Sequence, residues 1–289
     1  MVMGMPKGLI LGGAYAKLMP PKGKNSVNIV VLIKQVPESE ALVRVQADGS
    51  GIEIEDRYTL NFFDSLAVEE ALRIKEKIGS GTVICITLGT QKSIEVLRTA
   101  IAMGADDGIL LADPAFAGGD EYATAKALAA ALKKLDYDLI ICGREAFDDA
   151  SGIVGPLVAE FLGIPHITSV IKVDISTEKE AVIVERQVEN GTELIKAPLP
   201  VLLAAQKGLN EPRVPPVMGV MRATRAEIKK LDLAALGLSQ AEVGRAGSRE
   251  EIVRYHQPPV RPPVTMMQGA ADDAVKQLVK CLREAAKVI

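Results

Sequence analysis

Residues 138–165 read DLIICGREAFDDASGIVGPLVAEFLGIP and join a strand signal, a polar turn and a helix signal. The apolar run Leu139–Cys142 predicts a buried strand, and the apolar-periodic segment after the turn predicts a helix. The turn carries two adjacent carboxylates, Asp148 and Asp149. The local pattern favours a helix cap, because Asp, Ser and Gly before a helix satisfy its first free amides. A nucleotide-phosphate cradle is the alternative, because helix N-termini beyond strand ends bind anions.

Pro156 limits where this helix can begin. A helix that starts at Asp149 would be kinked by a proline so far inside it. A helix that starts near Gly155 would hold the proline in its first turn, where proline is tolerated. The sequence alone leaves both starts open.

The alternation of strand and helix signals extends toward the N-terminus. Short apolar runs bounded by glycine alternate with amphipathic segments, and this pattern is typical of βαβ units. We therefore predict an α/β fold with an open, mostly parallel sheet and helices on both faces. The predicted strands are 27–33, 82–89 and 107–113, and the predicted helices are 61–79, 93–105 and 124–135.

The pattern changes to a period of two after Pro165. Segments 169–176, 180–191 and 192–205 alternate apolar and polar residues and are separated by turn residues. They predict antiparallel strands added to the edge of the same domain.

Three parts of the chain are expected from these patterns. Residues 1–26 predict a flexible N-terminal extension, and 27–210 predict the α/β nucleotide-binding domain. Residues 211–289 predict a partner-binding arm, a linker and a C-terminal helix. The prolines of PRVPPVMGVMR (212–222) predict an extended arm, because each proline lacks an N–H donor. The helix predicted over 272–289 has an apolar stripe that needs another surface to cover it.

Composition excludes several classes of protein. A net charge of −3 and 3% aromatic residues argue against nucleic-acid binding, which relies on basic and stacking side chains. No apolar run reaches the ~18 residues of a membrane span. The cysteines Cys85, Cys142 and Cys281 lie far apart, which predicts a reduced, cytoplasmic protein with neither a disulfide nor a metal site.

Motifs for catalysis are missing. The chain contains no G-x-x-x-x-G-K-[ST] loop and no G-x-G-x-x-G after its first strand. His166 and His256 have no nucleophile or metal-ligand partner nearby in sequence, and no catalytic triad can be assembled. The chain therefore resembles a binding protein more than a hydrolase, and we assign no catalytic residue.

Polar residues and glycines recur where the predicted strands end. If the strands are parallel, the loops after them meet at one edge and form a single ligand slot. Each residue by itself is more typical of a cap or turn, so the inference depends on their convergence. The candidate binding residues at these ends are Lys34, Asn61, Asp64, Thr87, Gly89, Asp120, Thr124, Gly143, Arg144, Asp148 and Ser151.

Four stretches carry a resemblance to a known family: LNFFDSLAVEEALRIKE (60–76), RTAIAMGADDGILL (98–111), CGREAFDD (142–149) and APLPVLLAAQKGLNEPRVPP (197–216). From about Val27 to the C-terminus the chain resembles the beta subunits of electron-transfer flavoproteins. The resemblance implies an adenine-nucleotide-hydrolase-like fold and an electron carrier, not an enzyme, that pairs with an FAD-carrying alpha subunit. It implies that the beta subunit holds either AMP or, in electron-bifurcating members, a second FAD that accepts electrons from NADH.

The resemblance makes the turn after Cys142 the family's phosphate loop, so the cradle is also a helix start. It adds Gly152, Ile153 and Val154 to the candidate binding residues. Ile153 stands where the family usually has Gln, so the side-chain amide that would reach phosphate is missing. Losing one hydrogen bond to a charged group costs about 1.5–3 kcal/mol, which weakens nucleotide binding without abolishing it.

Cofactor and partner expectations follow from two further segments. LLADPAFAGGDEYAT (110–124) resembles the D-R-x-F-x-G-[SA]-D-T-x-A-T segment of bifurcating members and favours FAD over AMP. Val217, flanked by Met218 and Met221, matches the family's anchor for an acyl-CoA dehydrogenase or another redox partner. Packing of this anchor on the alpha subunit is the alternative. A universal-stress-type adenine-nucleotide-binding regulatory domain is the alternative function.

Overall fold

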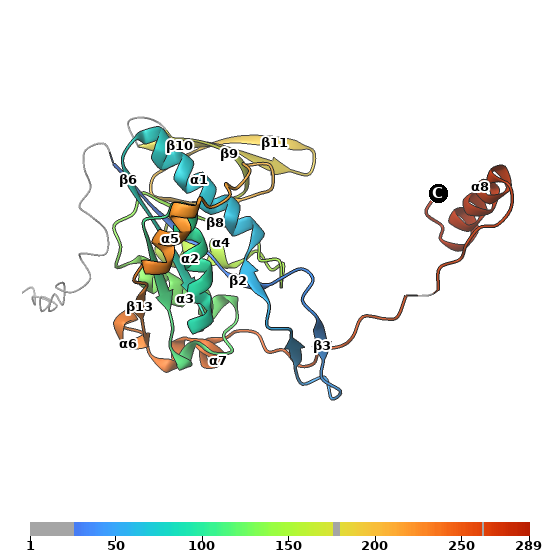
Figure 1. The fold of residues 1–289 in the computed structure, drawn as a ribbon, viewed down its shortest axis with the longest axis horizontal. Helices are drawn as coiled ribbons and strands as arrows, with labels where there is room; N and C mark the ends of the chain where they lie inside the picture. The colour runs from blue at the N-terminus through green and yellow to red at the C-terminus, as the bar shows by residue number, and fades with distance from the viewer. Residues whose placement is uncertain (1–25, 176–179, 262) are drawn as a thin grey trace, which may run out of the picture. The chain divides into compact units, whose positions relative to one another are not determined.

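The computed structural model describes residues 26–175, 180–261 and 263–289 (Figure 1). The N-terminal extension expected over 1–26 lies outside the described residues except for its last position. The described chain forms two compact units. The first comprises the residues up to Val43 together with Ile54–Val253, and the second comprises Arg44–Glu53 and Arg254–Ile289.

The first unit is built on a nine-stranded sheet with the order β11-β10-β9-β12-β8-β1-β6-β7-β13. The strands from β9 to β13 in that order pair in parallel, and β10 pairs antiparallel with both of its neighbours. This confirms the predicted open, mostly parallel sheet with antiparallel strands at one edge. The central strands are β1 (Val27–Leu32), β6 (Gly81–Leu88), β7 (Asp107–Leu111), β8 (Leu139–Gly143) and β12 (Val201–Ala205).

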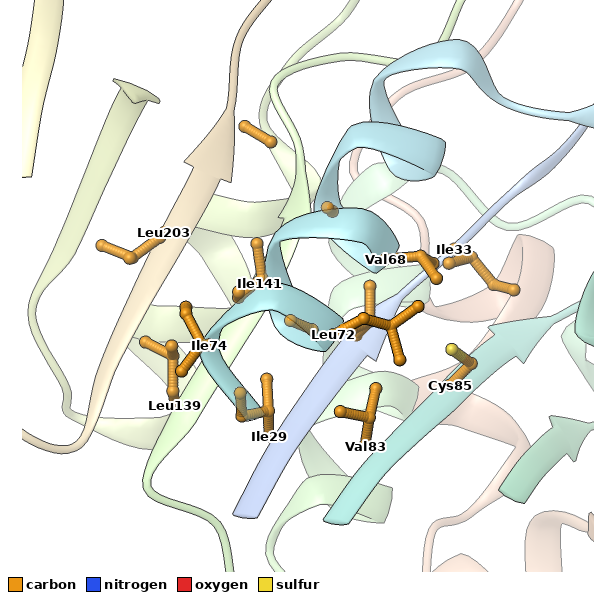
Figure 2. Packing of buried hydrophobic residues seen from close by; sticks show 14 of the residues in the cluster. Ile29, Ile33, Val68, Leu72, Ile74, Val83, Cys85, Leu139, Ile141 and Leu203 are labelled. Atoms are coloured by element: carbon orange, nitrogen blue, oxygen red, sulfur yellow. The ribbon is translucent and has the colours of Figure 1, made fainter. Parts of the chain in front are cut away.

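Helices cover both faces of the sheet, as predicted, because the strand residues alternate between two cores. In β1, Ile29 and Val31 belong to one buried cluster, whereas Val30 and Leu32 belong to the other. Figure 2 shows Leu72 of α1 in the first cluster with side chains of β1, β6 and β8. The helices are α1 (Phe62–Ile78) and α2 (Ile94–Met103) on the first face, and α3 (Glu121–Leu132) and α4 (Val154–Leu162) on the second.

The antiparallel edge differs from the prediction at one point. Segment 192–205 was expected as one antiparallel strand, but the structure splits it, and β12 lies parallel to both β8 and β9. Pro198 and Pro200 interrupt the segment because proline cannot donate to a ladder. The five residues of β12 are all buried, as in a central parallel strand. The edge strands are β9 (His166–Ile175), β10 (Ala181–Val188) and β11 (Gly191–Pro198).

The extended arm predicted over 212–222 is wrong for its second half, where the structure has helix α5 (Val217–Arg225) packed on α2. All three prolines of the segment precede the helix, and Pro216 occupies the N-cap, where no N–H is needed. The chain continues through β13 (Lys229–Leu231), α6 (Leu233–Leu236) and α7 (Gly244–Gly247).

The remaining elements are short, apart from the C-terminal helix. Helix α8 (Ala271–Lys280), with a π-helical turn at Cys281–Ala285, confirms the predicted C-terminal helix, and its Val275 and Leu278 are exposed. Among the described residues, no helix is long and apolar enough to cross a membrane. The other strands are β2 (Gln35–Pro37) paired with β5 (Tyr58–Leu60), and β3 (Val43–Val45) paired with β4 (Ile52–Ile54); 3₁₀ turns lie at Gln91–Ser93, Pro114–Phe116 and Gln240–Glu242.

Candidate functional site

The candidate site lies at the carboxyl ends of β8, β1 and β6, where the strand order reverses. The chain builds outward from β1 through β6 to β7, and then returns to β8 and β12 on the other side of β1. Leu32 pairs with Ile86 on one side and with Cys142 on the other. β1 ends at Leu32, β8 ends one residue beyond this level at Gly143, and β6 ends two residues beyond it at Leu88. This register brings the loops that hold Lys34, Thr87 and Gly143 to one edge. We call the loops 33–37, 87–93 and 143–153 the switch-point loops.

Asp64, in the first turn of α1, links two of the switch-point loops. Its carboxylate is 5% exposed and accepts hydrogen bonds from the backbone N–H of Lys34 at 2.7 Å and of Gly143 at 2.8 Å. Burial raises the pKa of Asp64 to about 7, although the two backbone N–H groups and Asn61 favour the charged form. Asp64 therefore acts on the ends of β1 and β8, which makes it a positioning residue.

Gly143 is required by this arrangement. A Cβ at this position would lie 2.4 Å from Oδ1 of Asp64, 2.7 Å from Cβ of Phe63 and 2.9 Å from the backbone N of Asp64. Two of these three atoms cannot move without shifting the first turn of α1. Only glycine lets β8 approach α1 so closely.

Asn61 fixes the loop that follows β8. Its Nδ2 donates to the carbonyl of Glu145 at 2.9 Å, and its Oδ1 accepts from the backbone N–H of Phe147 at 3.1 Å. The side chain is 1% exposed, so both bonds are shielded from water. Asn61 was predicted as a ligand contact, and the structure gives its amide a partner on each side within the chain.

Lys34 closes the same loop from the side of β1. Its ammonium lies 2.8 Å from Oδ1 of Asp148 and 2.8 Å from Oδ2 of Asp149. Burial lowers the pKa of Lys34, but the hydrogen bonds and charges of the two aspartates outweigh burial, and the pKa is raised. Lys34 therefore stays charged, and its charge is more than balanced by two carboxylates.

The start of α4 resolves the question raised by the turn. The helix begins at Val154, so Pro156 lies in its first turn, as the second of the two predicted starts requires. No side chain caps the helix; Asp149 accepts a hydrogen bond from the N–H of Ser151 at 3.0 Å within the turn. The helix-cap interpretation is therefore wrong in detail. Gly152 has φ +66°, a backbone conformation that L side chains rarely adopt.

Thr87 is the last residue but one of β6, and Gly89 follows the strand at the same edge. Thr87 is 1% exposed, and among the predicted site residues in the described chain it alone has a buried side-chain polar atom without a hydrogen-bond partner, Oγ1. A Cβ at Gly89 would lie 2.3 Å from Oγ of Ser93, whose hydroxyl donates to Gln35 at 3.1 Å. The hydroxyl of Thr87 is enclosed by the protein, so it is an unsatisfied polar group near the end of β6 and is not itself open to a ligand.

Asp120, in the loop after β7, is engaged by the protein itself. It caps α3 by accepting from the N–H of Ala123 at 2.8 Å, and it also accepts from the N–H groups of Arg249 and Glu250. The hydroxyl of Ser248 accepts from the N–H of Asp120 at 3.0 Å. Thr124 follows inside α3. The third loop is thus tied to residues 244–250, and no short-range sequence signal links Asp120 to Arg249.

We expect Asp120→Ala to release residues 244–250 and to lower the free energy of unfolding by about 2 kcal/mol, because an N-cap and two further acceptor contacts are lost. Amide hydrogen exchange of peptides from 244–252 measures the release. Asp120→Asn is the matched control, because Asn caps helices as well as Asp and should loosen only residues 249–250. Unchanged exchange in Asp120→Ala would show that the contacts do not hold the segment.

The remaining predicted residues lie on the surface. Arg144 pairs with Glu145 at 3.1 Å, and its backbone N–H donates to the carbonyl of Ala205. Ile153 is 41% exposed beside the start of α4. The three predicted partner contacts, Val217, Met218 and Met221, are all exposed on α5.

The fold and these loops first define a class: a doubly wound α/β protein whose polar and glycine-containing loops converge where the strand order reverses, which is where such folds bind ligands. A family model described as the electron transfer flavoprotein domain matches residues 51–236. The chain belongs to the electron transfer flavoprotein family and aligns along most of its length with its beta subunits.

Three relatives illustrate the match. The electron transfer flavoprotein subunit beta of Thermoanaerobacterium thermosaccharolyticum is 42% identical over 89% of this chain and 98% of its own length. That of Bacillus subtilis is 36% identical over 91% of this chain and 100% of its own length. The caffeyl-CoA reductase-Etf complex subunit CarD of Acetobacterium woodii is 36% identical over 89% of this chain and 98% of its own length. These names do not favour the alternative of a universal-stress-type regulatory domain.

Proposed function

We propose that this electron-transfer beta subunit pairs with an alpha subunit and holds FAD at the switch-point loops. The heterodimer would carry electrons between NADH or an acyl-CoA dehydrogenase and a second redox partner, and the chain by itself would not be an enzyme. The observation that carries the proposal is the convergence of the loops after β1, β6 and β8 where the strand order reverses, with the carboxylate of Asp64 joining two of them.

The residues present fit a nucleotide. The first turn of α4 lacks a side-chain cap, so backbone amides at Val154 and Gly155 and the hydroxyl of Ser151 are the groups that would hold phosphate. The charge of Lys34 is already balanced by Asp148 and Asp149, so Lys34 would orient the loop. The side chain of Ile153 cannot donate a hydrogen bond, so phosphate binding would depend more on the backbone amides.

In a cofactor-binding protein of this kind, the cofactor and the chain have separate roles. The flavin supplies the redox chemistry when bound, and the protein binds it, orients it and excludes water. Asp64 and Asn61 hold the loops in place, and Gly143 and Gly152 give the backbone its close approach and its turn.

FAD and AMP are distinguished by counting nucleotides. The purified heterodimer is denatured, and the released nucleotides are separated by chromatography. We expect two FAD per heterodimer, with reduction by NADH, because the segment 110–124 resembles that of bifurcating members. One FAD with one AMP would contradict the bifurcating assignment and leave a simple carrier. One FAD and no AMP per heterodimer would mean that the beta subunit holds no nucleotide, which would contradict the proposed site itself.

The proposed docking element for the redox partner is α5. Val217, Met218 and Met221 form an exposed apolar face, and methionine adapts to uneven partner surfaces. The name of the Acetobacterium woodii relative places that protein in a complex with a CoA-ester reductase, which supports a CoA-ester dehydrogenase as the partner class. Packing of this face on the alpha subunit would instead make α5 an assembly element.

A further inference from the structure

Helix α5 is short, exposes apolar side chains to solvent and depends on contacts with the rest of the protein for its position. Val217 is 77% and Met218 74% exposed, and only Ala223 of the nine residues is buried. A nine-residue helix is marginal by itself in water, so its position depends on tertiary contacts. The contacts that fix it therefore decide how the apolar face is presented.

The contacts of α5 with α2 use a glycine and an arginine. A Cβ at Gly219 would lie 2.2 Å from the carbonyl oxygen of Ala102, so the two helices approach too closely for any other residue. Arg222 donates to the carbonyls of Ile101 at 2.7 Å and Ala105 at 3.0 Å, at the end of α2. These contacts fix α5 against α2. The direction from which the chain enters α5 is set by the segment before the helix.

The chain before α5 is held by Arg213. Its guanidinium makes a forked contact with Glu69, from Nε at 2.7 Å and Nη2 at 3.1 Å, and a second fork with Glu76, from Nη1 at 2.6 Å and Nη2 at 3.1 Å. The backbone N–H of Arg213 also donates to Glu69 at 3.2 Å. Glu69 is buried on α1, so its charge needs a cationic partner, and both Arg213 and Arg73 supply one.

A second contact reinforces the first one helical position away. Asn210 donates from Nδ2 to the buried carboxylate of Glu70 at 3.0 Å and to the carbonyl of Leu66 at 3.0 Å. Burial raises the pKa of Glu70, against the hydrogen bond from Asn210 that lowers it. The segment 210–213 is therefore anchored to α1, and the stiff Pro215–Pro216 pair transmits its position to α5.

We propose that Arg213 is a positioning residue that sets the orientation of α5 toward the redox partner by fixing the segment before it to Glu69 and Glu76. The inference rests on the proposed docking role of α5. The planar fork that serves two carboxylates at once explains why the position holds arginine, since a lysine ammonium cannot reproduce it.

The experiment compares variants of the whole heterodimer by hydrogen exchange. In Arg213→Gln, we expect the amides of 214–222 to exchange about tenfold faster, with α1 peptides and flavin content unchanged. Arg73→Gln is the matched control: Arg73 also pairs with Glu69, at 3.2 Å, but lies on α1 itself and holds nothing before α5. Arg213→Lys should fall between the wild type and Arg213→Gln, and it replaces Arg213→Gln if that variant fails to assemble.

The second readout is electron transfer with an acyl-CoA dehydrogenase that the wild-type heterodimer accepts. Arg213→Gln should raise the KM for the dehydrogenase about as much as Val217→Ala does and leave kcat unchanged, because the docking face is displaced and the flavin site is intact. Unchanged exchange of 214–222 in Arg213→Gln and Arg213→Lys would overturn the inference. Faster exchange in Arg213→Gln with an unchanged KM for the dehydrogenase would also overturn the inference. If Val217→Ala left the KM unchanged as well, the result would contradict the proposed docking role of α5.

Discussion

Gly143→Ala is expected to lose the bound nucleotide and about 3 kcal/mol of the free energy of unfolding, because the new methyl group overpacks a rigid contact. The Cβ would lie 2.4 Å from Oδ1 of Asp64 and 2.9 Å from its backbone N. Relieving the clash requires α1 to move away from β8. That movement breaks the hydrogen bonds that the N–H groups of Gly143 and Lys34 donate to Asp64, and these bonds hold two of the switch-point loops.

Urea unfolding of the heterodimer and nucleotide release measure the two effects. Gly208→Ala is the matched control, because Gly208 has φ +103° with no atom within 4 Å of its Cβ position. It should cost only backbone strain of about 1 kcal/mol and leave the nucleotide in place. A Gly143→Ala variant that retains nucleotide and unfolds like Gly208→Ala would show that β8 and α1 tolerate the wider spacing.

Asp64→Asn is the second large effect, and it depends on pH. Above pH 7 the carboxylate is charged and accepts from two N–H groups, whereas the amide has one acceptor oxygen, so in the variant one buried N–H loses its partner and stability falls by about 1–3 kcal/mol. The folded-state pKa of Asp64 is raised to about 7, from 3.8, by burial. A raised pKa means that the folded protein holds the proton more tightly, so this contribution to stability is present at low pH and is lost as the pH rises through 7.

The difference in unfolding free energy between wild type and Asp64→Asn should therefore shrink by about 2 kcal/mol between about pH 5.5 and pH 8. Urea unfolding at both pH values measures it. Asp174→Asn is the control, since Asp174 pairs on the surface with Lys77 and its pKa is lowered, so its contribution does not fall in this range. A difference that stays constant would mean that Asp64 is charged throughout.

The fold could be predicted further than the roles of the site residues. The runs around Val30 and Ile140 are continuous and apolar, as buried parallel strands require, and Gly163 ends α4 in the left-handed conformation. Asp64 was predicted as a binding residue because it opens the first helix, and its contact with a ligand stays a prediction. Its inward direction was not predictable, since it depends on N–H groups of Lys34 and Gly143, which are remote in sequence.

Two other features were hidden for the same reason. Asp120 and Arg249 are 129 residues apart, and Arg213 and Glu69 are 144 apart, so neither contact leaves a periodic signal. The start of α5 was missed because three prolines were counted against the whole segment. Proline disrupts a helix only where its missing N–H would donate to the helix. Pro216 is the last of the three prolines and occupies the N-cap, so the helix can begin directly after it.

The central place of β1 in the sheet has a consequence for synthesis on the ribosome. β1 is the first strand of the described chain, yet one of its two neighbours is β8, and Asn28 bonds to Asp138, 110 residues later. At ~5–20 residues per second, β1 waits roughly 5–20 s after its emergence before that neighbour exists. During this interval its apolar edge is bare, so we expect nascent chains that stop before β8 to recruit chaperones and longer ones to release them.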